Sequence, residues 1–212
     1  MSRVPEAPSR AELPAEELAA YDAALARAER MRDDQPGAAI PPYFAALLSS
    51  PPLAAGLMEM GRIVRTLGER DDSYSHEQRE FVDQVLSALW RTNVVQRTHI
   101  PDALAVGVRI EAIDALRAGR DDDLTPEELF FATYIRDIAN GTVTDASYGA
   151  LVERLGERAA LEYTVFVGFL MQTIRNFQAL GMEDPSEQEI DALLEAFRSG
   201  RRALPDYRVR IR

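Results

Sequence analysis

Helix-start signals recur along this chain, and the segments between them lack the alternating pattern of a β-strand. The clearest signal is Thr125-Pro126-Glu127-Glu128, which combines an N-cap hydroxyl, a proline in the first turn and a capping-box acid. Three further starts follow the same logic: Ser75 with Gln78, Thr144-Asp145, and Ser186 to Glu189. Together these signals predict an all-α fold.

The expected helices can be placed from their apolar periodicity and their breakers. They cover residues 14–32, 43–48, 53–67, 76–90, 93–106, 110–118, 126–140, a segment from 145, 161–180 and 186–197. Pro51 and Pro52 should break the chain between two of these helices, and Pro101 should shorten or kink another. Residues 161–180 are the most apolar stretch, but Glu162, Gln172 and Arg175 interrupt it, which indicates a central or oligomer-interface helix.

Length and composition favour one soluble domain. A chain of 212 residues with 46% hydrophobic content can bury a core without disulfide or metal staples. We expect an extended or disordered N-terminus over residues 1–13, a single helical domain over 14–199 and a basic C-terminal tail over 200–212. No secretory signal and no membrane span are predicted, so the expected location is cytoplasmic.

The charge distribution argues against general nucleic-acid binding. The formal net charge is -11, whereas neutralising phosphates requires a basic surface. The last fifteen residues are the exception, with six Arg and one Asp. This tail is either a docking arm for an acidic partner or nucleic acid, or a tail that is solvated or folded onto its own acidic body, and the second interpretation is favoured.

The chain contains neither cysteine nor lysine, which limits its chemistry. Thiol nucleophiles, Cys-type zinc sites and Schiff-base lysines are excluded. Histidine has an unperturbed pKa near neutrality, so His99 is the first candidate for proton transfer. Glu80, nineteen positions earlier, is its candidate partner, although it could instead pair with Arg91 or Arg97. No metal site is predicted, because the two histidines lack close ligand spacing, and His76 is expected to face solvent.

The segment from Glu80 to Gly107 resembles the carboxymuconolactone decarboxylase and alkyl hydroperoxidase D family. The peroxidase branch of that family spaces its motif as Glu, eleven residues, Cys, two, Cys, three, His. Glu80 and His99 stand in this register, but Thr92 and Val95 occupy the two cysteine positions. A thiol peroxidase needs a thiolate and a resolving thiol, so the resemblance here implies the cysteine-free decarboxylase branch.

Weaker similarity extends over roughly residues 40 to 180 in the same order. It is carried by Pro42-Tyr43-Phe44, by Leu124 with Glu127 to Tyr134, and by Gly141 to Asp145 followed by Leu161-Glu162. The resemblance implies an oligomeric helical bundle, as a dimer, trimer or hexamer. It also implies a reaction that needs no organic cofactor, on a small organic acid such as a dicarboxylated lactone.

Five residues near the motif are candidates for substrate binding. Thr92 and Asn93 could donate hydrogen bonds to a bound carboxylate, or merely cap the helix that carries His99. Arg91 or Arg97 could clamp a carboxylate, although each alone is more often a surface residue. Trp90, with Phe81 and Tyr163, could line a pocket, but aromatic residues at helical spacing more often belong to the core.

The leading hypothesis is a cofactor-independent lyase or isomerase in which His99 transfers a proton and Glu80 orients it. The alternative is a non-catalytic helical oligomer that binds a ligand or a protein partner on the same scaffold.

Overall fold

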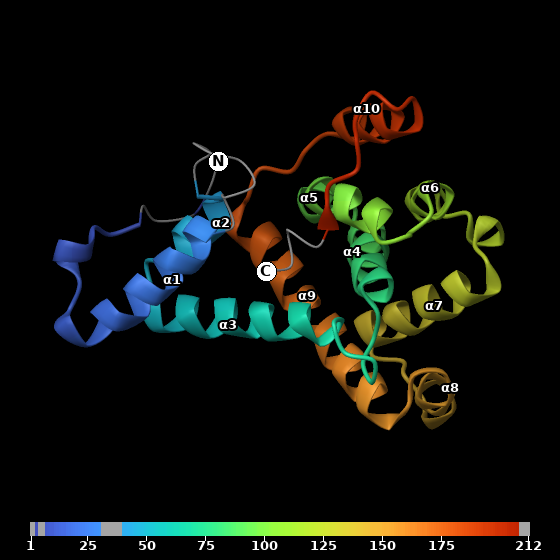
Figure 1. The fold of residues 1–212 in the computed structure, drawn as a ribbon, viewed down its shortest axis with the longest axis horizontal. Coiled ribbons are helices and arrows are strands. Elements are labelled where there is room, and N and C mark those ends of the chain that lie inside the picture. The colour runs from blue at the N-terminus through green and yellow to red at the C-terminus, as the bar shows by residue number, and fades with distance from the viewer. Residues whose placement is uncertain (1–2, 4–6, 31–39, 208–212) are drawn as a thin grey trace. The chain divides into compact units, whose positions relative to one another are not determined.

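The computed structural model describes residues 3, 7–30 and 40–207, and their regular structure is helical throughout (Figure 1). The α-helices are α1 Leu18–Arg30, α2 Pro42–Leu47, α3 Pro51–Leu67, α4 His76–Trp90, α5 Asn93–Ala105, α6 Ile110–Ala118, α7 Pro126–Asn140, α8 Asp145–Leu155, α9 Glu157–Leu180 and α10 Glu187–Arg198. Short 3-10 turns lie at Arg10–Glu12, Ala15–Glu17 and Asp121–Asp123. The predicted all-α fold class is confirmed.

The helices differ from their predicted bounds near the N-terminus and at the start of α9, which begins at Glu157, four residues before the predicted 161. The helix expected from residue 14 begins with a 3-10 turn, and a further turn at Arg10–Glu12 interrupts the segment expected to be extended. Residues 31–39, which include the expected end of that helix and the loop after it, lie outside the described residues. Pro51 opens α3, because a proline in the first helical turn gives up an N–H that has no intrahelical partner anyway.

Contacts group the chain into two compact units, with one boundary inside α3, one inside α9 and one shortly after the end of α9. The first comprises Met1–Val64 with Phe177–Met182, and the second Arg65–Asn176 with Glu183–Arg212. That residues 14–199 fold as a single domain stays a prediction. Among the described residues, no helix is long and apolar enough to cross a membrane.

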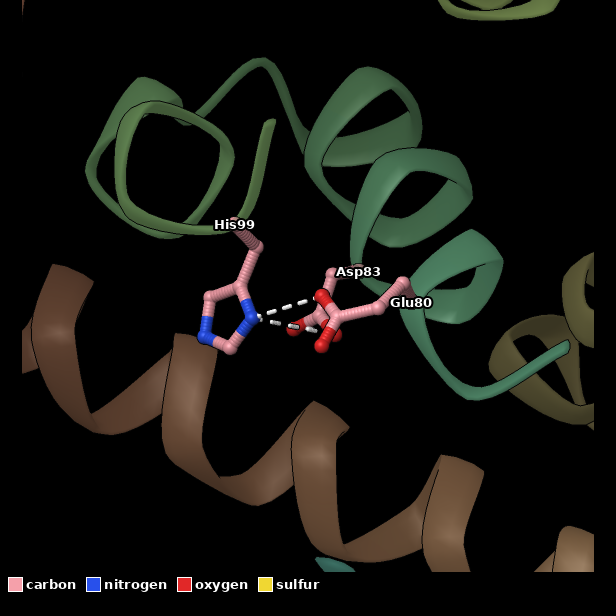
Figure 2. Close-up of side chains that lie close together, drawn as sticks. All are labelled: Glu80, Asp83 and His99. Atoms are coloured by element: carbon pink, nitrogen blue, oxygen red, sulfur yellow. Dashed lines mark hydrogen bonds and ion pairs between the residues drawn. The ribbon is translucent and has the colours of Figure 1, made fainter. Parts of the chain in front are cut away.

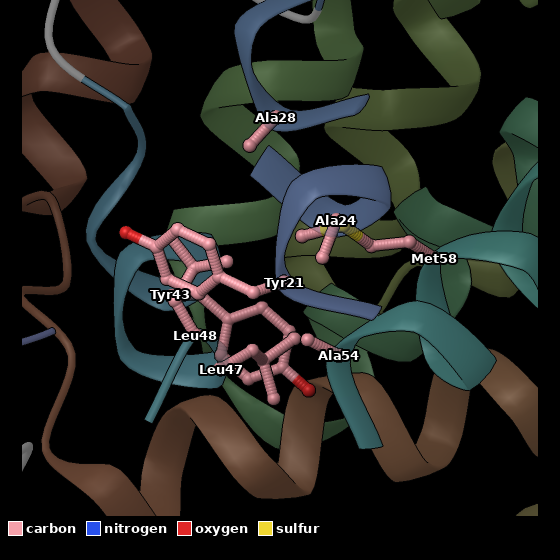
Figure 3. Close-up of a cluster of buried hydrophobic side chains, with 8 residues drawn as sticks. All are labelled: Tyr21, Ala24, Ala28, Tyr43, Leu47, Leu48, Ala54 and Met58. Atoms are coloured by element: carbon pink, nitrogen blue, oxygen red, sulfur yellow. The ribbon is translucent and has the colours of Figure 1, made fainter. Parts of the chain in front are cut away.

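The first unit is organised around a cluster of buried apolar side chains (Figure 3). Its members come from α1, from α2 and its end, and from α3: Tyr21, Ala24, Ala28, Tyr43, Leu47, Leu48, Ala54 and Met58. Phe177 closes the cluster, with its ring centroid 4.5 Å from that of Tyr43 in an edge-on arrangement. This unit is therefore held together by apolar packing.

The second unit is built around α4, which packs against α5, α6 and α7. Ser75 and Gln78 form a capping box at the start of α4, as predicted. The helix ends at Arg91, which adopts a left-handed conformation with φ 49°, and α5 begins directly afterwards at Asn93. The short turn leads α5 back along α4 and thereby sets Glu80 opposite His99.

Aromatic residues fill the core beside α4. Tyr163 of α9 is fully buried, and the rings of Tyr74 and Phe131 meet it edge-on at centroid distances of 5.7 and 5.5 Å. Phe81 is buried as well. Phe81 and Tyr163, which could have lined a pocket, thus belong to the core.

Candidate functional site

One face of α4 is polar although it is buried. Glu80, Asp83, Gln84 and Ser87 recur at three- and four-residue spacing, which places them on the same side of the helix. Counted over the whole residue, none of the four is more than 1% exposed. Burying polar groups is unfavourable unless partners compensate for the lost water, so this face requires an explanation beyond packing.

Glu80 and His99 are in direct contact, as the sequence predicted. The Nδ1 atom of His99 lies 2.9 Å from Oε2 of Glu80, within hydrogen-bond distance (Figure 2). The side chain of Glu80 is fully buried, whereas 20% of the His99 side chain is exposed. Figure 2 shows the second ring nitrogen, Nε2, pointing away from the carboxylates. His99 is thus held by Glu80 through Nδ1, while Nε2 makes no contact with the two carboxylates.

Asp83 is the third member of this site. Its Oδ2 atom lies 3.6 Å from the same Nδ1 atom of His99, a distance suited to an ion pair and too long for a hydrogen bond (Figure 2). Neither carboxylate oxygen of Asp83 has a hydrogen-bond partner among the described residues. Two carboxylates therefore face one imidazole nitrogen.

Arg79 balances the charge of Glu80 from the other side. Its guanidinium group forms a buried ion pair with Oε1 of Glu80 and donates a second hydrogen bond to the hydroxyl of Tyr207. That hydroxyl also lies 3.0 Å from Nδ1 of His76. A continuous series of contacts thus runs from Tyr207 through Arg79 and Glu80 to His99.

These contacts shift the protonation equilibria of the site. For His99, burial disfavours the cation, but the charges of Asp83 and Glu80 outweigh burial and raise its pKa to about 9. Burial would raise the pKa of Glu80, but Arg79 and His99 outweigh it and lower that pKa to about 2. The pKa of Asp83 is raised to about 7, chiefly by burial. At neutral pH, His99 is consequently a cation beside the Glu80 anion.

Arg65, in the last turn of α3, contributes to the electrostatics of this site. Its pKa is lowered by burial and by the positive charge of Arg79, while Glu80, Tyr207 and Asp102 act in the opposite direction. Two guanidinium groups therefore influence the two carboxylates next to His99.

Glu80, Asp83 and His99 also satisfy a minimal requirement for holding a metal ion. One ligand atom from each lies within 4.8 Å of the others, and two carboxylates with an imidazole are a donor set found around divalent metals. The expectation that the chain lacks close metal-ligand spacing missed this trio, because Asp83 was not considered. The ion pair between Arg79 and Glu80 opposes a cation here, because the guanidinium already occupies part of the Glu80 carboxylate.

The residues predicted to bind substrate lie at the turn between α4 and α5 and on the outer part of α5. Asp184 accepts hydrogen bonds from the backbone N–H groups of Asn93 and Val94, at 2.6 and 2.7 Å, and the Asn93 side chain donates to Pro185 and Glu187. These bonds attach the start of α5 to the segment before α10 and to the first residue of α10. The capping acceptor of α5 is thus Asp184, while the Asn93 side chain links the helix to Pro185 and Glu187 and does not itself cap it.

Other predicted binding residues also have structural partners. Thr92 is buried, with its hydroxyl 3.4 Å from Asp184. The Arg97 side chain is 60% exposed and lies 3.7 Å from Glu189. Trp90 is half-buried, and the guanidinium of Arg175 lies 3.8 Å from the centre of its ring. Arg91 is exposed at the end of α4. Substrate binding by Thr92, Asn93, Arg91, Arg97 and Trp90 stays a prediction.

Two sequence expectations near the site need correction. His76 does not simply face solvent, because it is half-buried and its ring packs edge-on against Tyr207. Glu80 pairs with its neighbour Arg79 instead of Arg91 or Arg97. The i, i+3 spacing of Glu80 and Asp83 could have revealed Asp83, whereas no local signal points to Tyr207, which is 128 residues from Arg79.

Comparison with known proteins bears on the fold. No protein-family model matches the sequence, and no curated protein matches it. A crystal structure from Ralstonia eutropha JMP134, described as the alkylhydroperoxidase AhpD core of an uncharacterized peroxidase-related protein, superimposes with a TM-score of 0.66 and 18% sequence identity. The match covers 88% of this chain and 93% of the other. The chain therefore has the all-α fold of an alkylhydroperoxidase AhpD core.

Proposed function

We propose that the protein is a cofactor-independent lyase or isomerase that acts on a small organic acid or lactone by proton transfer through His99. The observation that carries the proposal is the buried hydrogen bond between Glu80 and Nδ1 of His99. It fixes the orientation of the ring and leaves Nε2 for a reacting group. The fold is shared with a peroxidase-related protein, but a thiol peroxidase reaction would require a cysteine, and this chain contains none.

The charge state of the site makes His99 a proton donor. Two carboxylates keep the ring protonated at neutral pH, so Nε2 carries a hydrogen. In a decarboxylation, the bond between the substrate carbon and its carboxylate breaks, carbon dioxide leaves, and the electron pair moves onto a conjugated carbonyl. As the carbonyl re-forms, the electron pair returns to a carbon of the conjugated system, which takes the Nε2 proton, and solvent restores that proton to His99. Glu80 stays ionised throughout and stabilises the imidazolium.

The test is carbon dioxide release from 4-carboxymuconolactone by the purified protein and two variants. Removing a general acid lowers turnover by roughly 10²–10⁴-fold, which is the loss expected for His99→Gln. Ser87→Ala is the matched control, because Ser87 lies on the same buried face of α4, its hydroxyl has no hydrogen-bond partner among the described residues, and the proposal gives it no role. Circular dichroism should show that both variants fold.

Each result has a defined meaning. Turnover that is lost in His99→Gln and kept in Ser87→Ala supports the proposal. Full turnover in His99→Gln would refute the role of His99. No release by the wild-type protein from this lactone or from a panel of 3-oxo acids, together with no isomerisation of them, would refute the proposed enzyme class and favour a non-catalytic binding role.

A further inference from the structure

Asp83 is a buried carboxyl group that packing does not explain. Its side chain is 2% exposed and its two oxygens have no hydrogen-bond partner in the described part of the chain. An apolar side chain of similar size would avoid the desolvation penalty of a buried carboxylate. The nearest opposite charge is His99, at 3.6 Å. The ion that accounts for Asp83 is therefore the protonated imidazole.

The two carboxylates interact with His99 in different ways. Nδ1 of His99 carries a single hydrogen, and Glu80 accepts it at 2.9 Å. Asp83 faces the same nitrogen from 0.7 Å further away (3.6 minus 2.9 Å), too far to compete for that hydrogen but near enough for Coulomb attraction. Arg79 already neutralises much of the Glu80 charge, whereas no ion pair between Asp83 and an arginine is found in the described residues.

We infer that Asp83 is a positioning residue that acts through His99: its carboxylate, facing the same nitrogen as Glu80, keeps the imidazole ring protonated and its outer nitrogen turned toward the reacting group. The part of this inference that concerns the reacting group rests on the proposed function, whereas the part that concerns the protonation of His99 does not. Charged groups near the ring are Glu80 and Asp83 on α4 and Asp102 on α5, with Arg79 and Arg65 acting on the carboxylates. In the described part of the chain, Glu80 has an ion pair with Arg79 in addition to its contact with His99, whereas the ion-pair partner found for Asp83 is His99.

The experiment is a nitrogen NMR titration of the histidine rings, which needs no substrate. The chain has only two histidines, so His76→Gln assigns both sets of signals. In Asp83→Asn the side chain keeps its shape but loses its charge. We expect the titration midpoint of His99 to fall by about one pH unit or more, which is a roughly tenfold loss of proton affinity. Ser87→Ala should leave the midpoint unchanged.

A catalytic readout accompanies the titration. In Asp83→Asn, the alkaline limb of the pH profile of kcat should move to lower pH together with the NMR midpoint. A midpoint that stays in place or rises would overturn the inference, whatever the activity. If Asp83→Asn does not fold, Asp83→Ser removes the charge with less bulk and is judged by the same midpoint. If the wild-type protein shows no lyase or isomerase activity but the His99 midpoint falls in Asp83→Asn, the proposed function is refuted and this inference stands.

Discussion

Replacing Arg79 by Met should destabilise the protein strongly, because it leaves the Glu80 carboxylate buried without its guanidinium partner. The side chains of the pair are 5% and 0% exposed. At an effective dielectric constant of about 20, unit charges ~4 Å apart attract by about 4 kcal/mol, and breaking a buried pair typically destabilises a protein by about 3–5 kcal/mol. Since His99 still faces Glu80, we expect a loss near the lower end, about 3 kcal/mol.

The assay is urea unfolding at neutral pH, followed by far-ultraviolet circular dichroism. With a slope of about 2–3 kcal/mol per molar urea for a chain of this size, the midpoint should fall by about 1 M or more. In a Glu80→Gln background, Arg79→Met should matter much less, because a neutral amide does not need the guanidinium. The double-mutant cycle thereby isolates the charge interaction.

A surface ion pair provides the matched control. Arg198 pairs with Asp114, and the two side chains are 37% and 34% exposed. Arg198→Met should therefore destabilise the protein by less than about 1 kcal/mol. Equal losses for Arg79→Met and Arg198→Met, or strictly additive effects of the Arg79 and Glu80 substitutions, would refute the argument from burial.

Three further outcomes follow from the same contacts. The pKa of His99 is about 9 in the folded protein against an ordinary 6.5. The stability advantage of the wild type over His99→Gln should therefore be full below about pH 6.5 and disappear as pH rises through 9, a change of up to about 3 kcal/mol in urea titrations. An advantage that grows with pH would contradict the raised pKa of His99. Asp184→Ala removes the acceptor at the start of α5 and should cost about 1–2 kcal/mol by the same method, whereas exposed Glu183→Ala should have little effect. Tyr207→Phe deletes the hydroxyl bound to Arg79 and should lower stability by about 1 kcal/mol in thermal melts; an unchanged melting temperature would count against that contact.

Features that depend on neighbours along the chain were predictable. The capping boxes at Ser75, Thr125, Thr144 and Ser186 are all present, because each is completed by a residue three positions later. The bounds of α4 and α6 agree with the prediction for the same reason. The contact between Glu80 and His99 was also predictable, through the resemblance and its spacing.

Contacts between distant segments were not predictable. Tyr207 reaches Arg79 across 128 residues, and Asp184 caps α5 from 91 residues away. A basic C-terminal segment gives no sign that one of its residues folds back onto α4, because charge and periodicity describe local surroundings only. Arg208, Arg210 and Arg212 of the predicted tail lie outside the described residues.

The buried polar face of α4 also bears on how such a site could change in descent. Replacing Arg79 or His99 would leave the buried Glu80 carboxylate without one of its partners, a loss of about 1–3 kcal/mol or more, against a total stability of about 5–15 kcal/mol for a typical domain. A lineage that did not need the proposed reaction would have to exchange several of these residues together for apolar ones. Stepwise mutation would be opposed by selection for folding alone, so these side chains would outlast the activity they once served.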